Sequence, residues 1–110
     1  MATNFSSVDQ LLTASAATVL TAPAGSQIVI LKATAYNSDT LAHSATLYRI
    51  ASGGSAAITG QLTGTGTTIG AGGTVILPIS GLTLSVQQFI QAKADLTSVV
   101  SLSLSYAITP

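Results

Sequence analysis

The chain has 110 residues, which is the length of one domain, and its net charge at pH 7 is zero. Charged residues make up 5% of it, against about 25% in ordinary globular proteins, which excludes the basic surfaces that bind nucleic acid or anionic membranes. The lack of cysteine excludes disulfides and cysteine chemistry, and since neither a long apolar segment nor a signal-peptide pattern occurs, we expect no transmembrane helix and no secretion signal.

The start of the chain shows little regular pattern. Residues 1–10 are expected to form an N-terminal arm, followed by a single β-sandwich domain over residues 11–110. An alternative for this region is a single helical turn over residues 7–12, capped by Ser7. A short strand over residues 18–21 is expected to end at the turn sequence Ala-Pro-Ala-Gly that follows it.

The middle of the chain alternates between strand patterns and turns. Residues 27–37 predict a strand with apolar residues on both faces near its start, so this strand is central in a sheet or has a covered outer face. Residues 44–50 predict the next strand, which forms either a hairpin with the previous one or a crossing between sheets. Residues 60–73, rich in Gly and Thr, predict a long mobile loop with at most a weak strand over residues 67–69.

The last third carries three more strand patterns. Residues 74–79 predict a strand that Pro78 places at a sheet edge or beside a bulge, and residues 88–95 predict another. The clearest alternation lies at the C-terminus, where large apolar side chains occupy every second position from Val100 to Ile108. About seven to eight strands separated by Gly and Pro turns predict an all-β protein, a single β-sandwich of jelly-roll or immunoglobulin-like type.

Few residues could carry chemistry. His43 is the one histidine and follows Asp39 by four residues, but no Gly-x-Ser-x-Gly motif accompanies it, and we interpret it as a solvated loop histidine. Asp9, Asp39 and Asp95 lie in the arm, in a turn and near a strand end, and no pattern indicates that two of them converge. No metal-ligand spacing occurs. The chain is therefore predicted to be no enzyme and to use no cofactor or metal, and an enzyme centred on His43 is the weakest alternative.

Tyr36 and Tyr48 are predicted to share an outward face. They form either a partner-binding patch, because tyrosine is enriched at interfaces, or an ordinary cross-strand pair. The same two rings are the one candidate for an aromatic platform that binds glycans.

The scarcity of charge itself indicates an assembly. A freely diffusing protein keeps a charged surface that opposes association, whereas this chain is rich in Ser, Thr and Ala and nearly uncharged. The strand over residues 98–108 contains neither charge nor proline, and as a bare edge it would invite aggregation. We expect much of the surface to be covered by copies of the chain or by a scaffold.

Several segments resemble a group of small virion proteins of tailed bacteriophages. The similarity covers most of residues 11–108 and rests on low-complexity structural motifs, namely Leu11 to Gly25 with its Thr-Ala-Pro-Ala-Gly end, Leu47-Tyr48 followed by Ser52-Gly53-Gly54, Gly81-Leu82-Thr83-Leu84, and Ile90-Gln91-Ala92-Lys93-Ala94. The chain departs from the group at residues 85–88, where a Gly-Asp turn is common. The resemblance implies a β-sandwich that decorates a capsid or belongs to the tail, and it carries over no catalytic residue.

We therefore expect a non-enzymatic virion structural protein, foremost a capsid decoration or cement protein that binds and stabilises the assembled head. It would be made in the host cytoplasm and reside in the virion, on the capsid surface in preference to the tail. Expected partners are the major capsid protein or other virion proteins and further copies of the chain, with a trimer favoured, and neither nucleic acid nor membrane. A tail, neck or fibre protein is the alternative, and a glycan-binding module is less favoured.

The arm and the glycine-rich loop are expected to supply the assembly contacts, together with the two tyrosines. The predicted contact residues are Thr3, Asn4, Phe5, Tyr36, Tyr48, Thr65, Thr67 and Ile69.

Overall fold

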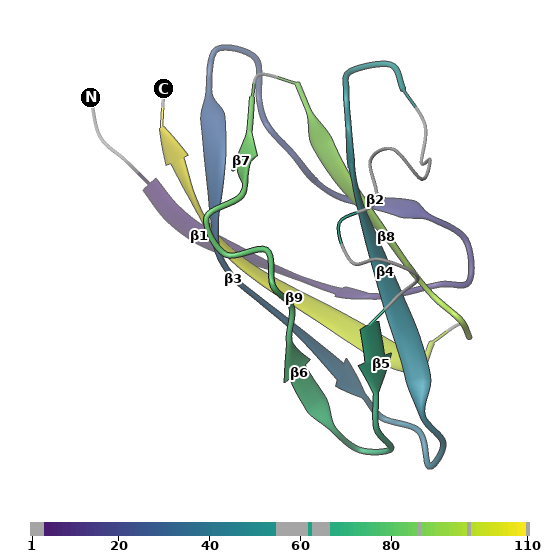
Figure 1. The fold of residues 1–110 in the computed structure, drawn as a ribbon. Helices are drawn as coiled ribbons and strands as arrows, with labels where there is room; N and C mark the ends of the chain where they lie inside the picture. The colour runs from purple at the N-terminus through teal and green to yellow at the C-terminus, as the bar shows by residue number, and fades with distance from the viewer. Residues whose placement is uncertain (1–3, 55–61, 63–66, 86, 97, 110) are drawn as a thin grey trace.

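A computed structural model describes residues 4–54, 62, 67–85, 87–96 and 98–109. These residues form nine β-strands in two antiparallel sheets that pack against each other (Figure 1). The predicted all-β sandwich is confirmed, with one or two strands more than the sequence patterns indicated. Among the described residues, no helix is long and apolar enough to cross a membrane.

The order of the strands is that of a jelly roll. The first sheet consists of β1 (Asn4–Leu11), β3 (Gln27–Asn37), β6 (Thr74–Ile76), β7 (Thr83–Leu84) and β9 (Val100–Thr109), and the second of β2 (Ala17–Thr21), β4 (His43–Ile50), β5 (Thr67–Ile69) and β8 (Phe89–Ala94). Hydrogen bonding gives the orders β1-β9-β3-β6, with β7 also on β3, and β2-β8-β4-β5. Strand β1 pairs with β9, β2 with β8, β3 with β6, and β4 with β5. This is the double Greek key of a jelly roll, so the immunoglobulin-like alternative does not apply.

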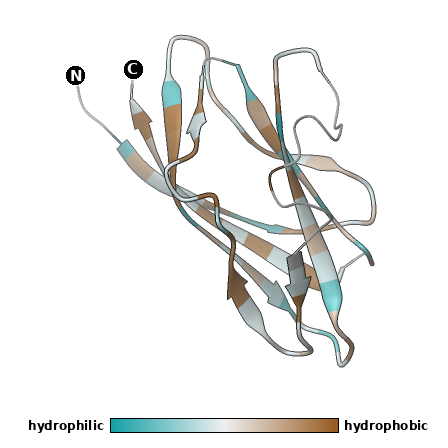
Figure 2. Ribbon diagram, viewed as in Figure 1, coloured by the Kyte–Doolittle hydropathy of each residue, from teal (hydrophilic) through white to brown (hydrophobic). Residues whose placement is uncertain are grey.

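Strand β9 is the central hydrophobic strand of the first sheet. Val100, Leu102 and Leu104 are fully buried, while Ser101 and Ser103 between them point to the other face. Hydrophobic and pale segments accordingly alternate along this strand (Figure 2). The strand lies between β1 and β3 and is therefore no exposed edge. The strand carries no charged side chain and would be an aggregation risk at an edge, but its backbone is hydrogen-bonded on both sides.

The segment expected to be an N-terminal arm is, from Asn4 onward, strand β1. Residues 4–11 pair with residues 101–108 of β9 in an unbroken register, so the helical turn considered for residues 7–12 is wrong. The strand is extended, as an arm would be, but it is an edge strand of the sheet. The sequence pattern missed it because most of its side chains remain exposed, which leaves no alternation of polar and apolar residues to detect.

A β-bulge explains the apolar residues on both faces of β3. Ile28 and Ile30 are buried before the bulge, and Ala33 and Ala35 are buried after it. The register with β9 shifts between Ile30 and Lys32, so one additional residue is inserted and the face that points to the core changes parity. The strand is central, as predicted.

Pro78 ends β6 earlier than expected. The strand stops at Ile76, although the Leu77 amide still donates to the Ala33 carbonyl at 2.8 Å. Proline has no amide hydrogen, so the ladder cannot continue through residue 78. Leu77 and Ile79 nevertheless pack into the core, and the chain returns to β3 at Leu82, which accepts a hydrogen bond from Ile30.

Candidate functional site

Three ionisable residues meet at one end of the sandwich. Asp39 lies in the loop after β3, His43 begins β4, and Asp95 follows β8. The His43 Nε2 lies 2.6 Å from Asp39 Oδ2, and its Nδ1 lies 3.1 Å from both oxygens of Asp95. The backbone amide of Ser44 donates to Asp95 Oδ1 at 3.1 Å. The expectation of a solvated histidine and of aspartates that do not converge is therefore wrong.

The cluster favours the charged form of all three groups. Hydrogen bonding to Asp39, and then to Asp95, raises the pKa of His43 above 6.5, although burial opposes this. The pKa of Asp39 falls below 3.8, mainly because its carboxylate accepts from His43. Burial acts most strongly on Asp95 and disfavours its charge, but the Ser44 amide and His43 together lower its pKa. Both carboxylates thus favour the protonated, imidazolium form of His43.

This arrangement suits an ionic cross-link and does not suit a general base. A catalytic histidine needs one nitrogen free to accept a proton from a nucleophile, whereas both nitrogens of His43 here face carboxylates. Among the described residues, no group of three or more His, Cys, Asp or Glu side chains is arranged to hold a metal ion. The cluster ties the β3–β4 loop to the end of β8.

The cross-link predicts a particular dependence of stability on pH. The contribution of His43 is fully present below its ordinary pKa of 6.5 and is lost as the pH rises through the raised pKa of the folded state. The contribution of the aspartates is present above 3.8 and is lost as the pH falls through their lowered pKa values. We expect His43→Gln to lower the melting temperature most between about pH 4 and 6.5. Above pH 6.5 the melting temperature of the original chain should fall as His43 loses its proton, and that of the variant should fall less. Thermal melts from pH 4 to 9 test this, and an unchanged pH profile in the variant would contradict it.

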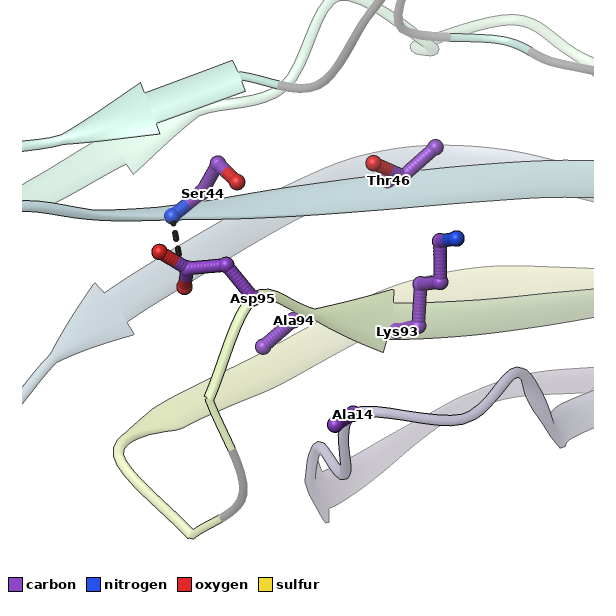
Figure 3. A pocket seen from close by; sticks show the side chains of 6 residues that line it. All are labelled: Ala14, Ser44, Thr46, Lys93, Ala94 and Asp95. Atoms are coloured by element: carbon purple, nitrogen blue, oxygen red, sulfur yellow. Dashed lines mark hydrogen bonds between the residues drawn. The ribbon is translucent and has the colours of Figure 1, made fainter.

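A shallow pocket opens beside the cluster on the outer side of the second sheet. Its volume is about 290 Å³, and it is lined by Ala14, Ser44, Thr46, Lys93, Ala94 and Asp95 (Figure 3). Ser44 and Thr46 come from β4, Lys93 comes from β8, and Ala14 lies on the β1–β2 connection. Lys93 and Asp95 carry opposite charges. We assign no chemistry to this pocket.

Asn37 is a structural residue that the sequence patterns placed at the end of the predicted strand 27–37 without indicating its role. Its side chain is fully buried, and its Nδ2 donates to the carbonyls of Leu41 at 2.8 Å and Ile69 at 3.1 Å. The Nδ2 also lies 3.3 Å from the Gly70 carbonyl, while Oδ1 accepts from the Asp39 amide at 2.9 Å. Asn37 therefore joins the end of β3 in one sheet to the end of β5 in the other. Only the position of an Asn at the end of a strand hinted at this role.

The predicted contact residues are not gathered in one place. Thr3 and Thr65 lie outside the described residues, and Thr67 begins β5. Asn4 and Phe5 begin β1, where the Phe5 side chain is 73% exposed. Tyr36 is 45% exposed on β3 and also remains available for contacts.

Two of the predicted contact residues, Tyr48 and Ile69, have buried side chains. Tyr48 is 7% exposed and Ile69 is fully buried in the core. Tyr36 and Tyr48 also lie in different sheets, since β3 and β4 form a crossing and not a hairpin. The two rings therefore do not form the shared platform that glycan binding would require.

The outer face of the first sheet carries most of the exposed apolar surface. Of seven large exposed hydrophobic side chains among the described residues, Phe5, Leu11, Tyr36 and Ile76 lie on it, as the register with β9 shows. We call this surface the open face, and its further members are Ser7, Asp9, Val29, Lys32, Thr34, Thr74, Ser101, Ser103, Ser105 and Ala107. Small and polar side chains separate the large apolar ones on this face. Exposed apolar side chains gathered on one face favour an interaction surface.

The fold defines the class of the protein as a two-sheet β-sandwich. No protein-family model and no curated protein matches the chain. A similar solved structure is that of Bacillus endospore appendages, which form a novel family of disulfide-linked pili. It aligns with a TM-score of 0.53 and 13% sequence identity, over 97% of this chain and 84% of that chain. At this identity the likeness shows the fold alone.

Proposed function

We propose that the protein is a non-enzymatic structural subunit of a virion, and foremost a decoration protein that binds and stabilises an assembled capsid. The observation that carries the proposal is the open face, an exposed sheet surface with large apolar side chains and only two charged residues, Asp9 and Lys32, among its described members. A monomer that stayed in solution would expose a surface with more charge. The resemblance to small phage virion proteins points in the same direction.

The mechanism follows from repeated weak contacts. Each subunit contributes a modest apolar contact, and attachment to neighbouring subunits raises the effective concentration of the next contact. A subunit that binds the assembled shell and not the dissociated coat protein stabilises the shell by mass action. The rigid sandwich suits this role because its exposed contact residues lie on strands with a fixed register.

The second candidate is a subunit of a surface filament. It is favoured by the likeness in fold to the endospore appendages, which form pili. Those pili are disulfide-linked, whereas this chain contains no cysteine. A filament of this chain would therefore have to be held by noncovalent contacts between sandwiches.

Particles that lack the chain provide the test. We expect heads made without it to release their DNA at lower temperature, and we expect added purified chain to restore the release temperature. A dye-accessibility melt of purified particles measures this. If particles with and without the chain release DNA at the same temperature and the chain does not sediment with them, the decoration role is wrong.

A further inference from the structure

Three strands of the open face are arranged symmetrically about β9. Strand β9 lies between β1 and β3, and β6 extends the sheet beyond β3. The register places residues of the three strands in rows across the face, so that Leu11, Ser101 and Tyr36 share one row. Large side chains thus lie on both flanks of a central stripe of small ones.

We propose that the open face docks against the open face of a second copy of this chain, related by a twofold axis that runs along β9. The inference rests on the proposed role as an assembly subunit and names the partner of that surface. Such an axis lays β1 of each copy over β3 of the other and keeps every row in register, which is the condition for a self-complementary interface.

The apolar residues on the two flanks match under this operation. Leu11 of each copy, 54% exposed, meets Tyr36 of the other, 45% exposed. Phe5, 73% exposed, meets Val29 in the same way, because both pair with Ala107 of β9. The small side chains of β9 along the axis let the two sheets approach closely.

The two charges on the face also match. Asp9 lies on β1 opposite Ser103, and Lys32 lies on β3 opposite Ser105, so the two are on different flanks and one row apart. One row is about 6.8 Å along a strand, a distance that the flexible lysine stem can span. Each copy therefore offers an acid where the other offers a base. A partner surface with charges of one sign only would gain no net electrostatic attraction to a face whose charges sum to zero. This favours a second copy as the partner.

The area sets the strength of the contact. The axis along β9 leaves β6 of each copy beyond β1 of the other, so three strands overlap. Eight residues of β1 and the width of three strands give roughly 27 Å by 14 Å, or about 400 Å² per copy. The total of about 800 Å² lies below the roughly 1,000 Å² of a stable specific interface. We therefore expect a weak dimer, with a dissociation constant in the high micromolar range for the free protein.

Charge reversal tests the pairing. Asp9→Lys and Lys32→Asp each place like charges across the axis, so each single variant should weaken dimerisation about tenfold or more, and the double variant should restore it. Sedimentation equilibrium of the full chain over micromolar concentrations measures this, with thermal melts to confirm folding. Arg49→Asp, an exposed reversal on the other sheet, is the matched control and should leave the dimer unchanged. Single variants that dimerise like the original chain would overturn the inference.

Crosslinking tests the geometry, because the chain contains no cysteine of its own. The double variant Leu11→Cys and Tyr36→Cys should form a disulfide-linked dimer on mild oxidation. The two positions are separated by β9 within one copy, too far for an internal bridge. Leu41→Cys with Tyr36→Cys, which adds an exposed loop position, should crosslink far less. Equal crosslinking of both variants would contradict the twofold arrangement.

These outcomes are separable from the decoration role. If the chain is monomeric and still stabilises heads, the dimer is wrong and the proposed function stands. If the chain dimerises but never sediments with particles, the proposed function is wrong and the dimer interface stands.

Discussion

Replacing Asn37 by aspartate is expected to reduce the free energy of unfolding by about 3–5 kcal/mol. The fully buried Nδ2 donates to the carbonyls of Leu41 and Ile69, and the substitution puts a carboxylate oxygen against these acceptors. The Asp39 amide can still donate to one carboxylate oxygen, but the other oxygen faces only carbonyls. The buried carboxylate must therefore either remain charged at high cost or take up a proton. Either event weakens the link between the two sheets at this end of the sandwich.

Urea unfolding at pH 7 measures this loss, and the chain offers a matched control. Asn4→Asp is the same substitution at an exposed position of β1 and should change stability by less than about 0.5 kcal/mol. Equal stability of the two variants would show that the hydrogen bonds of Asn37 contribute nothing to stability.

The second large effect is expected for Leu104→Ala, at about 2–5 kcal/mol. Leu104 is fully buried on the central strand of the first sheet, opposite Ala33 on β3 and Val8 on β1. Its buried neighbours on β3, Ala33 and Ala35, are too small to fill the cavity. Since a domain of this size is stable by about 5–15 kcal/mol, the loss is a large share of the total.

Ser105→Ala provides the comparison on the same strand. Ser105 is exposed on the outer face, so its truncation should change stability by less than about 0.5 kcal/mol. Chemical denaturation of both variants measures the difference. If Leu104→Ala unfolds at the same urea concentration as Ser105→Ala, the assignment of inner and outer faces of β9 is wrong.

Strands that bury one of their two faces could be predicted from the sequence. The bounds of β3 and β5 agree with the predicted ranges, and β9 was indicated by its alternating leucines and serines. Period-two burial leaves a direct trace in the residue types. Strand β1 leaves none, because its stability comes from backbone hydrogen bonds to β9 and not from a buried face.

Long-range features could not be predicted in the same way. The bulge in β3 is one inserted residue, and its signal, apolar residues on both faces, has more than one explanation. The ionic cluster joins His43 to Asp95, 52 residues away, through the order of strands in the second sheet. Only its local half, Asp39 four residues before His43, was visible in the sequence. The segment between β3 and β4 is compatible with a hairpin or with a crossing between sheets, so the sequence does not decide whether Tyr36 and Tyr48 lie in one sheet.

The fold and the surface together explain the composition. A jelly roll with its uncharged central strand covered on both sides does not need charge to protect that strand. Four of the seven large exposed apolar side chains among the described residues lie on the open face. The proposed role as an assembly subunit accounts for the low charge of the rest of the surface.

Electron cryomicroscopy of particles that contain the chain tests the structural role most directly. The account predicts regular density for the two-sheet sandwich over the head, at symmetry-related positions and with the open face buried. Density along a filament or confined to the tail would contradict the decoration role. Particles without any such density would contradict the proposal that this protein is a virion subunit.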